Sequence, residues 1–280
     1  MSTDISRRKF VTVAGGTAAA VAALGLVGCS SSDDSEDTSS DTGSSTETEE
    51  TEETSSTTYI IATDTTFAPF EFTNDDNEFV GIDVDLLAGA MEIAGLSYEL
   101  QSLGFDAAVA ALESGQADGV IAGMSITEER EESYDFSDPY YDSYVCAAAA
   151  DGGDITSLED CAGLTVAAKT GTQSASWAES IADEYGFEIS YFDQSDLMYQ
   201  DVTTGNSACC FEDYPIMSYG IAQGNGMTII ATEEEEYATP YGFAVLKDEN
   251  QELLEGFNEG LAEMQESGEY DEIIAKYLEA

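Results

Sequence analysis

Two basic residues, Arg130 and Lys169, stand where a positive charge could bind an anion. The chain has seven Lys and Arg residues against 58 Asp and Glu, and Arg7, Arg8 and Lys9 account for three of the seven. Arg130 ends the run TEER and Lys169 opens the run KTGT after an apolar stretch. Each is therefore expected in the first turn of a helix after a strand, where backbone N–H groups favour anions. The pattern predicts a grip on the carboxylate of a small molecule.

Both cations also have an alternative role as ion-pair partners. Arg130 could pair with acids one turn earlier on its own helix, and Lys169 could pair with a surface carboxylate. The other two basic residues of the body, Lys247 and Lys276, are expected to be solvated and to flank helices.

The composition excludes several classes of function. A net charge of −51 argues against binding nucleic acid or anionic membranes, both of which need clustered Lys and Arg. The chain has no His, which removes Ser-His-Asp and Cys-His nucleophiles and every His-ligated metal. No catalytic residue, cofactor or metal is expected, and the protein is not expected to be an enzyme. The charge fits both an exported soluble protein and one that works in high salt.

Residues 1–29 are expected to be a targeting segment. The run SRRKFV resembles a twin-arginine export motif, with general secretion as the alternative, and a weakly apolar stretch follows it. The stretch ends in LVGC, which resembles a lipobox whose Cys29 is lipidated and becomes the mature N-terminus. A membrane-anchor helix is the alternative, but the stretch is barely long enough to span a bilayer. We therefore expect a lipid anchor on the outer face of the cytoplasmic membrane.

Residues 30–58 contain only Ser, Thr, Asp, Glu and Gly. Because no apolar side chain offsets the entropy of ordering, this segment is predicted to be a disordered tether, with a cation-binding tail as the alternative. Four cysteines follow it, Cys146, Cys161, Cys209 and Cys210, in apolar surroundings. They are expected to be small buried hydrophobes rather than metal ligands. One disulfide is possible among them, and the adjacent pair should point to opposite faces of a strand.

Strands and helices alternate after residue 58, which predicts an α/β fold of two lobes with mostly parallel sheets. Strands are expected over 59–63, 98–101, 119–122, 144–148, 164–168, 188–191, 208–211, 228–231 and 241–245. Helices are expected over 84–94, 106–114, 195–202, 215–222, 252–266 and 270–278, with others beginning at Thr127 and Thr172. In such folds ligands bind where strand ends run into helices. The loops there offer a cation, acids and aromatic faces, as a free amino acid requires.

Seven stretches occur in the order typical of one family: TFAPFEF, FVGIDVDLL, AGMSITEEREESYDFSDPYY, AAKTGT, EDYP, YGFAVLKD and GEYDEIIAKYL. On these stretches the chain resembles the polar amino-acid-binding proteins of ABC importers, family 3 of the extracellular solute-binding proteins, and in particular the glutamine binders. The resemblance implies a type II periplasmic-binding-protein-like fold with two hinge strands. It assigns residues 59–142 and 240–280 to lobe 1 and residues 143–239 to lobe 2.

The resemblance also implies a role for each matching residue. Arg130 would clamp the ligand α-carboxylate with Ser125 and the Gly123 backbone, and Asp213 would receive the α-ammonium. The remaining predicted ligand contacts are Phe67 and Phe105 as aromatic walls, Lys169 and Thr172 near the ligand side chain, and Asp64 in the first loop. Two residues depart from the glutamine binders: Gln173 replaces a small Gly, and Glu212 adds a negative charge beside Asp213.

The implied function is capture of a free polar L-amino acid, glutamine first, by a monomer that closes around it and delivers it to an ABC permease with a cytoplasmic ATPase. Two alternatives stay open. One is an exported enzyme like cyclohexadienyl dehydratase, with Glu212 or Asp64 as its acid. The other is the sensory domain of a receptor.

The charge predicts a strong dependence of stability on salt. Repulsion among the carboxylates opposes the compact state, and the Debye length falls from ~10 Å at 0.1 M salt to ~3 Å at 1 M. We expect the melting temperature to climb with NaCl across this range. A flat profile would show that the carboxylates are already compensated locally.

Overall fold

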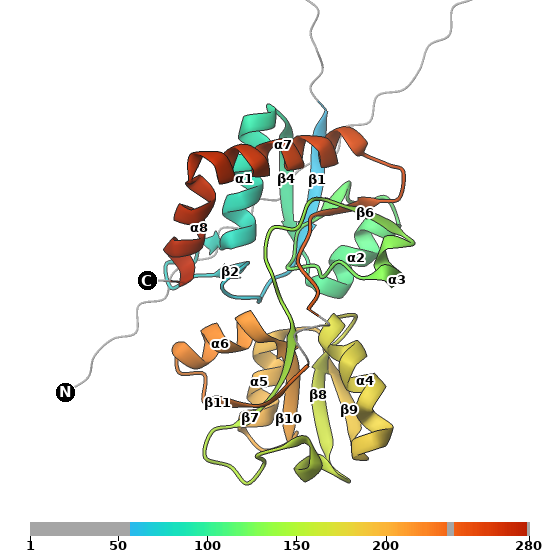
Figure 1. The fold of residues 1–280 in the computed structure, drawn as a ribbon, viewed down its shortest axis with the longest axis vertical. Coiled ribbons are helices and arrows are strands. Elements are labelled where there is room, and N and C mark those ends of the chain that lie inside the picture. Colours follow the sequence, from blue (N-terminus) through green and yellow to red (C-terminus); the bar gives the residue numbers. More distant parts are fainter. Residues whose placement is uncertain (1–56, 234–237, 279–280) are drawn as a thin grey trace, which may run out of the picture. The chain divides into compact units, whose positions relative to one another are not determined.

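A computed structural model describes residues 57–233 and 238–278. The predicted targeting segment, Cys29 and nearly all of the predicted tether lie outside these residues. Within them, no helix combines the length and apolar character needed to cross a membrane. The described chain contains two five-stranded sheets, each with its own helices (Figure 1).

The first sheet has the spatial order β4-β1-β5-β12-β6. Its strands are β4 (Ser97–Ser102), β1 (Thr58–Thr63), β5 (Gly119–Val120), β12 (Ala244–Leu246) and β6 (Tyr134–Phe136). The helices of this half are α1 (Ile82–Ala94), α2 (Phe105–Glu113), α3 (Glu128–Glu131), α7 (Gln251–Ser267) and α8 (Glu269–Leu278). A small hairpin of β2 (Phe72–Thr73) and β3 (Phe79–Val80) precedes α1.

The second sheet has the order β11-β7-β10-β8-β9. Its strands are β11 (Met227–Thr232), β7 (Val145–Ala150), β10 (Cys209–Asp213), β8 (Thr165–Lys169) and β9 (Glu188–Phe192). The helices of this half are α4 (Gln173–Tyr185), α5 (Ser195–Thr203) and α6 (Tyr214–Ala222), with a 3-10 turn at Leu158–Cys161.

Each sheet is more mixed than the sequence predicted. In the first sheet β1 pairs in parallel with β4 and β5, whereas β12 pairs antiparallel with β5 and β6. The second sheet likewise has two parallel and two antiparallel pairings. The antiparallel pairings arise where the chain crosses from one sheet to the other and returns. The α/β class and the two-lobe arrangement are confirmed.

The two crossing segments lie against each other. Tyr241 N donates to Tyr141 O at 2.8 Å, and Thr239 N donates to Ser143 O at 3.0 Å. Tyr241 is fully buried, and its backbone also forms a β-bridge with Ser125, one of the residues that the sequence nominated as a ligand contact. The path between the sheets is therefore tied to the residues that the sequence placed in the site.

Alternation along β1 divides the core of the first half into two layers. Ile61 packs in a cluster with Leu86 of α1 and Phe257 of α7, whereas Ala62 packs with Leu112 of α2 on the other face. Successive strand residues point to opposite faces, so one strand serves both layers. The helices thereby fix the carboxyl end of β1, where Asp64 follows.

The same alternation separates the adjacent cysteines of β10. Cys209 packs with Cys161 and Phe211 on one face, and Cys210 packs with Cys146 and Met217 on the other. All four described cysteines are buried, free thiols, and Cys161 Sγ lies 3.5 Å from Cys209 Sγ. The predictions of opposite faces and of apolar burial are confirmed.

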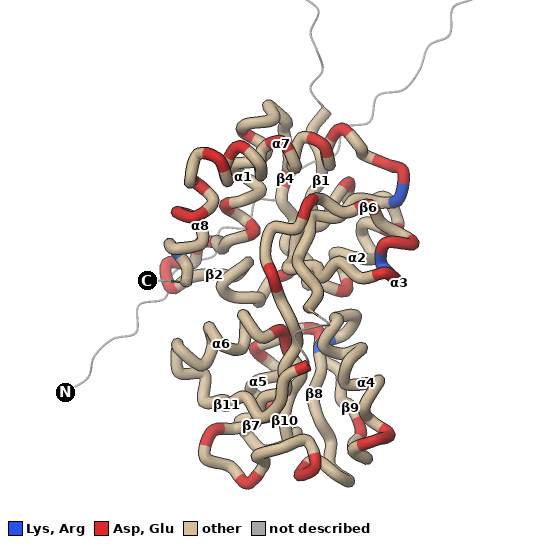
Figure 2. Tube along the Cα trace, in the orientation of Figure 1, with Lys and Arg blue, Asp and Glu red and all other residues tan. Residues whose placement is uncertain are grey.

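Acidic residues lie along most helices and loops of both halves, with few basic positions among them (Figure 2). Lys247 Nζ pairs with Asp135 at 2.8 Å and Lys276 Nζ pairs with Asp85 at 2.6 Å, and both lysines are exposed. Exposed pairs of this kind contribute about 0–1 kcal/mol. These two lysines are solvated, as predicted.

Close packing of α1 against α7 generates a prediction. A Cβ added at Gly260 of α7 would overlap the backbone of Ala90 on α1. One added at Gly89 of α1 would overlap the flexible thioether of Met264 and lie at ordinary contact distance from Glu269 Oε1. Gly260→Ala should lower the free energy of unfolding by about 1–3 kcal/mol, although Ala favours a helix interior by ~1 kcal/mol. Gly89→Ala is the matched control and should stay within about 1 kcal/mol of wild type. Equal effects in urea unfolding would contradict this account.

Candidate functional site

Residues from both halves meet in one pocket. Its lining comprises Asp64, Phe67, Phe105, Ala122, Gly123, Ser125, Arg130, Lys169, Thr172, Gln173, Glu212 and Asp213. All nine residues that the sequence nominated as ligand contacts are among these. The first seven of the twelve belong to the half with β1, and the last five belong to the half with β8 and β10. The structure thus brings the nominated residues together from five separate stretches of chain.

Arg130 carries a charge that no described carboxylate neutralises. Thr127 caps α3 by accepting a hydrogen bond from Arg130 N at 3.2 Å, which fixes the start of this short helix. Arg130 Nη1 donates to Ser125 O at 2.8 Å, and Arg130 Nη2 donates to Gly171 O at 3.1 Å. Among the described residues, the ion pairs involve the three lysines and not Arg130. The alternative in which Arg130 pairs with acids of its own helix is therefore not observed.

Burial lowers the pKa of the Arg130 guanidinium, while the charge of Asp213 opposes this effect. A guanidinium remains protonated at physiological pH in spite of such a shift. The ring of Phe105 also lies 5.4 Å from Arg130 Cζ, which favours the cation. The site therefore presents a fixed positive charge to the pocket.

Asp213 is the complementary acid, at the end of β10. Its Oδ1 accepts from Ser174 Oγ at 2.6 Å, and its Oδ2 accepts from Tyr241 Oη at 2.6 Å. Burial raises the pKa of Asp213, whereas these two hydroxyl donors and the charge of Arg130 lower it. No Lys or Arg forms an ion pair with Asp213 among the described residues.

Glu212 precedes Asp213 but points to the other face of β10. It accepts from Ser195 Oγ at 2.9 Å, from Tyr199 Oη at 2.8 Å and from Asp213 N at 3.0 Å. Burial, followed by repulsion from Asp213, raises the pKa of Glu212 to about 7. Such a pKa would suit a general acid, but three donors already hold the oxygens of Glu212. Its contacts with α5 make it a support for the end of β10.

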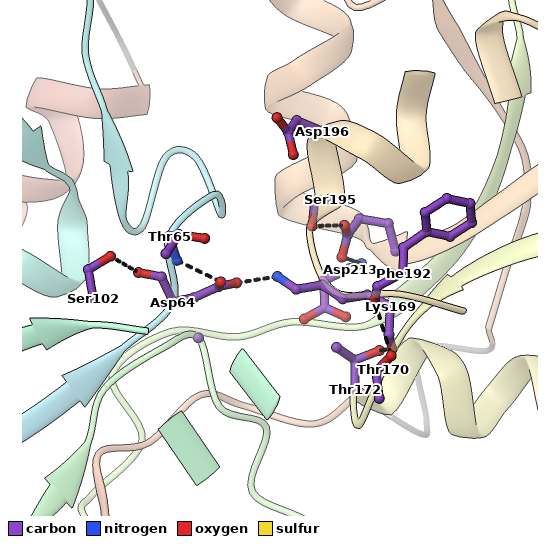
Figure 3. A network of polar contacts seen from close by, with 12 residues as sticks. Asp64, Thr65, Ser102, Lys169, Thr170, Thr172, Phe192, Ser195, Asp196 and Asp213 are labelled. Atoms are coloured by element: carbon purple, nitrogen blue, oxygen red, sulfur yellow. Dashed lines mark hydrogen bonds and ion pairs between the residues drawn. The ribbon is translucent and has the colours of Figure 1, made fainter. Parts of the chain in front are cut away.

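Lys169 is the last residue of β8, not part of a helix, because α4 begins only at Gln173. The prediction that it lies in the first turn of a helix is wrong, since a Gly-containing turn separates strand and helix. Its ammonium pairs with Asp64 across the two halves, and both side chains are buried (Figure 3). The predicted alternative, in which Lys169 pairs with a surface carboxylate, is wrong because its partner Asp64 is buried.

Asp64 is itself held in place by its neighbours. Its Oδ1 accepts from Thr65 N at 2.6 Å, and its backbone oxygen accepts from Ser102 Oγ at 3.1 Å (Figure 3). The Lys169 ammonium also lies 5.0 Å from the ring centre of Phe67. Phe67 thus lies beside the Lys169 ammonium, and Phe105 lies beside the Arg130 guanidinium.

Thr172 and Gly123 shape the pocket through the backbone. Thr172 Oγ1 donates to Lys169 O at 2.8 Å and accepts from Ala175 N at 3.1 Å, so it caps α4. Gly123 adopts φ 52°, and a Cβ there would overlap the ring of Phe67. Only glycine combines this left-handed conformation with so close an aromatic ring.

The sequence did not identify the residues that hold Asp213. Tyr241 lies at the return crossing and Ser174 in the first turn of α4. Their distance from Asp213 along the chain gives no local pattern, although a polar residue just after a helix cap is a weak indication for Ser174. Ala122 also lines the pocket and was not nominated.

The two halves are in contact through the site. Besides the Lys169–Asp64 ion pair, Arg130 reaches Gly171 in the loop that precedes α4. The cavity that remains measures about 10 Å3, about the space for one water molecule. Admission of anything larger requires the halves to separate or Lys169 to move. No group of three or more acidic or Cys side chains in residues 57–233 and 238–278 could hold a metal ion.

A family model for the bacterial extracellular solute-binding proteins, family 3, matches residues 59–280. Among curated relatives, the arginine-binding extracellular protein ArtP of Bacillus subtilis (strain 168) is 32% identical over 225 residues, covering 78% of this chain and 85% of the relative. The L-cystine-binding protein TcyJ of Escherichia coli (strain K12) is 28% identical, covering 80% and 83%.

Solved structures agree with this match. An ancestral arginine-binding protein bound to arginine has a TM-score of 0.72 and 35% identity, covering 79% of this chain and 98% of that one. An ancestral arginine-binding protein bound to glutamine has a TM-score of 0.70 and 34% identity, covering 79% and 97%.

Proposed function

The chain belongs to the bacterial extracellular solute-binding proteins, family 3, and we propose that it captures a free polar L-amino acid, glutamine first, and delivers it to an ABC permease. The observation that carries this proposal is the pair of opposite charges left without ionic partners, Arg130 and Asp213. They come from different halves and face one small pocket. A zwitterion offers a carboxylate to the first and an ammonium to the second.

The guanidinium geometry favours a carboxylate. Arg130 presents a planar fork of donors that matches two carboxylate oxygens at once. Its present acceptors are backbone oxygens of Ser125 and Gly171, which are neutral. Exchange of a neutral acceptor for a carboxylate strengthens the hydrogen bonds, because charge-assisted bonds are about twice as strong as neutral ones. Ser125 and the Gly123 backbone would complete this end of the ligand.

The other end of the pocket favours an amide side chain. Lys169 provides a donor and Asp64 an acceptor, and they are already paired. A glutamine amide can accept from the ammonium through its oxygen and donate to the carboxylate through its NH2 group. The guanidinium of an arginine ligand would meet the Lys169 charge at close range, which disfavours it. Phe67 and Phe105 would enclose the aliphatic part.

Capture would couple to closure. Asp64 and Arg130 belong to one half, and Lys169 and Asp213 belong to the other. A ligand shifts an open–closed equilibrium only by the difference between its affinities for the two states. A ligand that touches all four residues gains most of its contacts in the closed state. We therefore propose that the permease, with its cytoplasmic ATPase, recognises the closed form.

We further propose that the protein is a monomer held outside the cell by a lipid on Cys29, with residues 30–58 as the tether. The twin-arginine-like run and the lipobox-like run support this anchor. The alternative enzyme would use Glu212 or Asp64 as its acid. In the structure three donors hold Glu212, and Asp64 is paired with Lys169, so neither acid is free to protonate a substrate.

Calorimetry with the full set of standard L-amino acids tests the proposal. We expect one site per chain, a dissociation constant in the micromolar range or tighter for glutamine, and weaker binding of arginine. Small-angle scattering should show compaction on binding. The decarboxylated analogue of glutamine, which Arg130 cannot grip, is the matched control and should give no measurable heat. If no amino acid binds, the proposal fails; if arginine binds best, only the choice of glutamine fails.

Substitutions should separate the two ends of the pocket. Arg130→Ala should weaken every amino acid by roughly 2–5 kcal/mol, as expected when one member of a buried charge pair is deleted, and Arg130→Lys should restore little because an ammonium lacks the fork. Lys169→Ala should lower the affinity for glutamine while leaving unchanged or raising the affinity for amino acids with other side chains. Lys247→Ala, at an exposed ion pair, is the control and should change nothing. Equal losses across the ligand panel for Arg130→Ala and Lys169→Ala would contradict the assignment of Lys169.

A further inference from the structure

Two acids that the proposed function does not use, Glu71 and Asp83, are completely buried beneath the pocket. Glu71 ends the loop that carries Phe67, and its backbone pairs with that residue. Asp83 lies in the first turn of α1, and its N–H donates to Phe70 O at 2.9 Å. Neither carboxyl has any exposed surface. Buried acids without a compensating cation are costly, so their presence requires an explanation.

The hydrogen bonds of the two acids do not balance if both are ionised. Asp83 Oδ2 accepts from Gly123 N at 2.7 Å and from Tyr140 Oη at 2.9 Å. Asp83 Oδ1 and both oxygens of Glu71 receive no N–H or O–H from another described residue. The two acids are neighbours, because Asp83 N donates to the backbone oxygen of Phe70, the residue before Glu71, and each acid shifts the pKa of the other. Two carboxylates have only acceptors, so these unpartnered oxygens can bond to each other only if one of the two acids holds a proton.

The surroundings indicate which acid holds the proton. Burial raises the pKa of Glu71 well above its usual range, and the charges of Asp83 and Asp64 add to this effect while Lys169 opposes it. Burial also raises the pKa of Asp83, to about 6, but the Gly123 amide, Tyr140 and Glu71 lower it. Asp83 thus has two donors that favour its charged form, and Glu71 has none.

We propose that Glu71 and Asp83 share a single proton held on Glu71, and that the charged Asp83 is a positioning residue for the Gly123 backbone at the floor of the pocket. Gly123 lines the pocket in a left-handed conformation against Phe67. Asp83 Oδ2 accepts a hydrogen bond from the Gly123 amide and a second one from Tyr140 Oη, so Tyr140 holds Asp83 in place. Tyr140 is in turn anchored to α8, because Tyr270 Oη donates to Tyr140 O at 2.5 Å.

The proton limits the negative charge beside an anion site. The charged groups that face the pair are Asp64 and Lys169, which already neutralise each other. With Glu71 neutral, the pair contributes one negative charge instead of two near the position proposed for the ligand carboxylate. This last step rests on the proposed function. The shared proton itself does not.

Infrared spectroscopy of the unaltered protein tests the proton directly. At about pH 7.5 the exposed acids are ionised, since their usual pKa values are about 4. Glu212, whose pKa is about 7, also contributes at this pH, so we expect a residual band of a protonated carboxylic acid that remains in Glu212→Gln and is lost when Glu71→Gln is added to that variant. Absence of the band from the wild-type spectrum would overturn the proposal without any variant. Persistence of the band in a folded variant that carries both Glu71→Gln and Glu212→Gln would overturn the assignment to Glu71.

Thermal unfolding tests the same proton through stability. A carboxyl whose pKa is raised in the folded state costs stability once the pH exceeds its unfolded value of about 4.3, because folding must then take up a proton. Glutamine mimics the protonated acid without that cost. Glu71→Gln should therefore melt higher than wild type at about pH 7.5, with a smaller difference at about pH 5. The exposed Glu78→Gln is the matched control and should show no such trend. A lower melting temperature for Glu71→Gln at both values would overturn the proposal.

Ligand affinity tests the positioning role. Glu71→Gln should keep glutamine affinity within about threefold, whereas Asp83→Asn should lose about tenfold or more, as expected when a buried hydrogen-bonding partner is replaced. Glu71→Leu, which cannot donate to Asp83, should behave like Asp83→Asn. Equal affinity of Asp83→Asn and wild type would refute the role of Asp83. If wild type binds no amino acid, the proposed function fails while the infrared and thermal results still decide the shared proton.

Discussion

A half-buried guanidinium that forms no ion pair with any described carboxylate is the constraint on which this structure depends. The chain carries 58 acids and seven bases, so the simplest state of any arginine would be an ion pair. Arg130 instead has two backbone oxygens and an aromatic face. These neighbours hold the side chain in place without cancelling its charge. A partly desolvated charge of this kind is costly without an anion, which under the proposed function would favour a ligand carboxylate.

The fold supplies this arrangement by placing strand ends opposite each other. Asp64 follows β1 and Asp213 ends β10, and Arg130 reaches the same space from within α3. Because each of these residues is anchored by its own half, their mutual distances depend on how the halves approach. Tyr241 couples the two requirements, since it lies at the return crossing and donates to Asp213. The hydrogen bond of Tyr241 thereby links the path of the chain between the sheets to Asp213, the acid proposed to bind the ligand ammonium.

Local patterns explain why much of this was predictable, and long-range pairing explains the rest. The alternation of strands and helices predicted the α/β fold and the polar loops that hold the site, and the family resemblance nominated nine residues, which share one pocket. The sequence misplaced Lys169 because a Gly turn looks like the start of a helix. It could not pair Lys169 with Asp64, 105 positions away, nor Tyr241 with Asp213. The antiparallel strands were missed for the same reason, since β12 joins its sheet only after the chain has crossed to the other half and returned.

Under the proposed function, the Lys169–Asp64 pair would give the pocket a second means of discriminating between ligands. This ion pair joins the two halves of the protein in the region where a ligand side chain would lie. A ligand that separates Lys169 from Asp64 must therefore offer an acceptor to Lys169 and a donor to Asp64. An aliphatic side chain would leave two buried charges without hydrogen bonds, and a charged one could compensate only one of them. An amide supplies an acceptor and a donor on adjacent atoms at no net charge. Selectivity in this pocket would therefore come less from its shape than from the cost of breaking a bond that the protein already makes with itself.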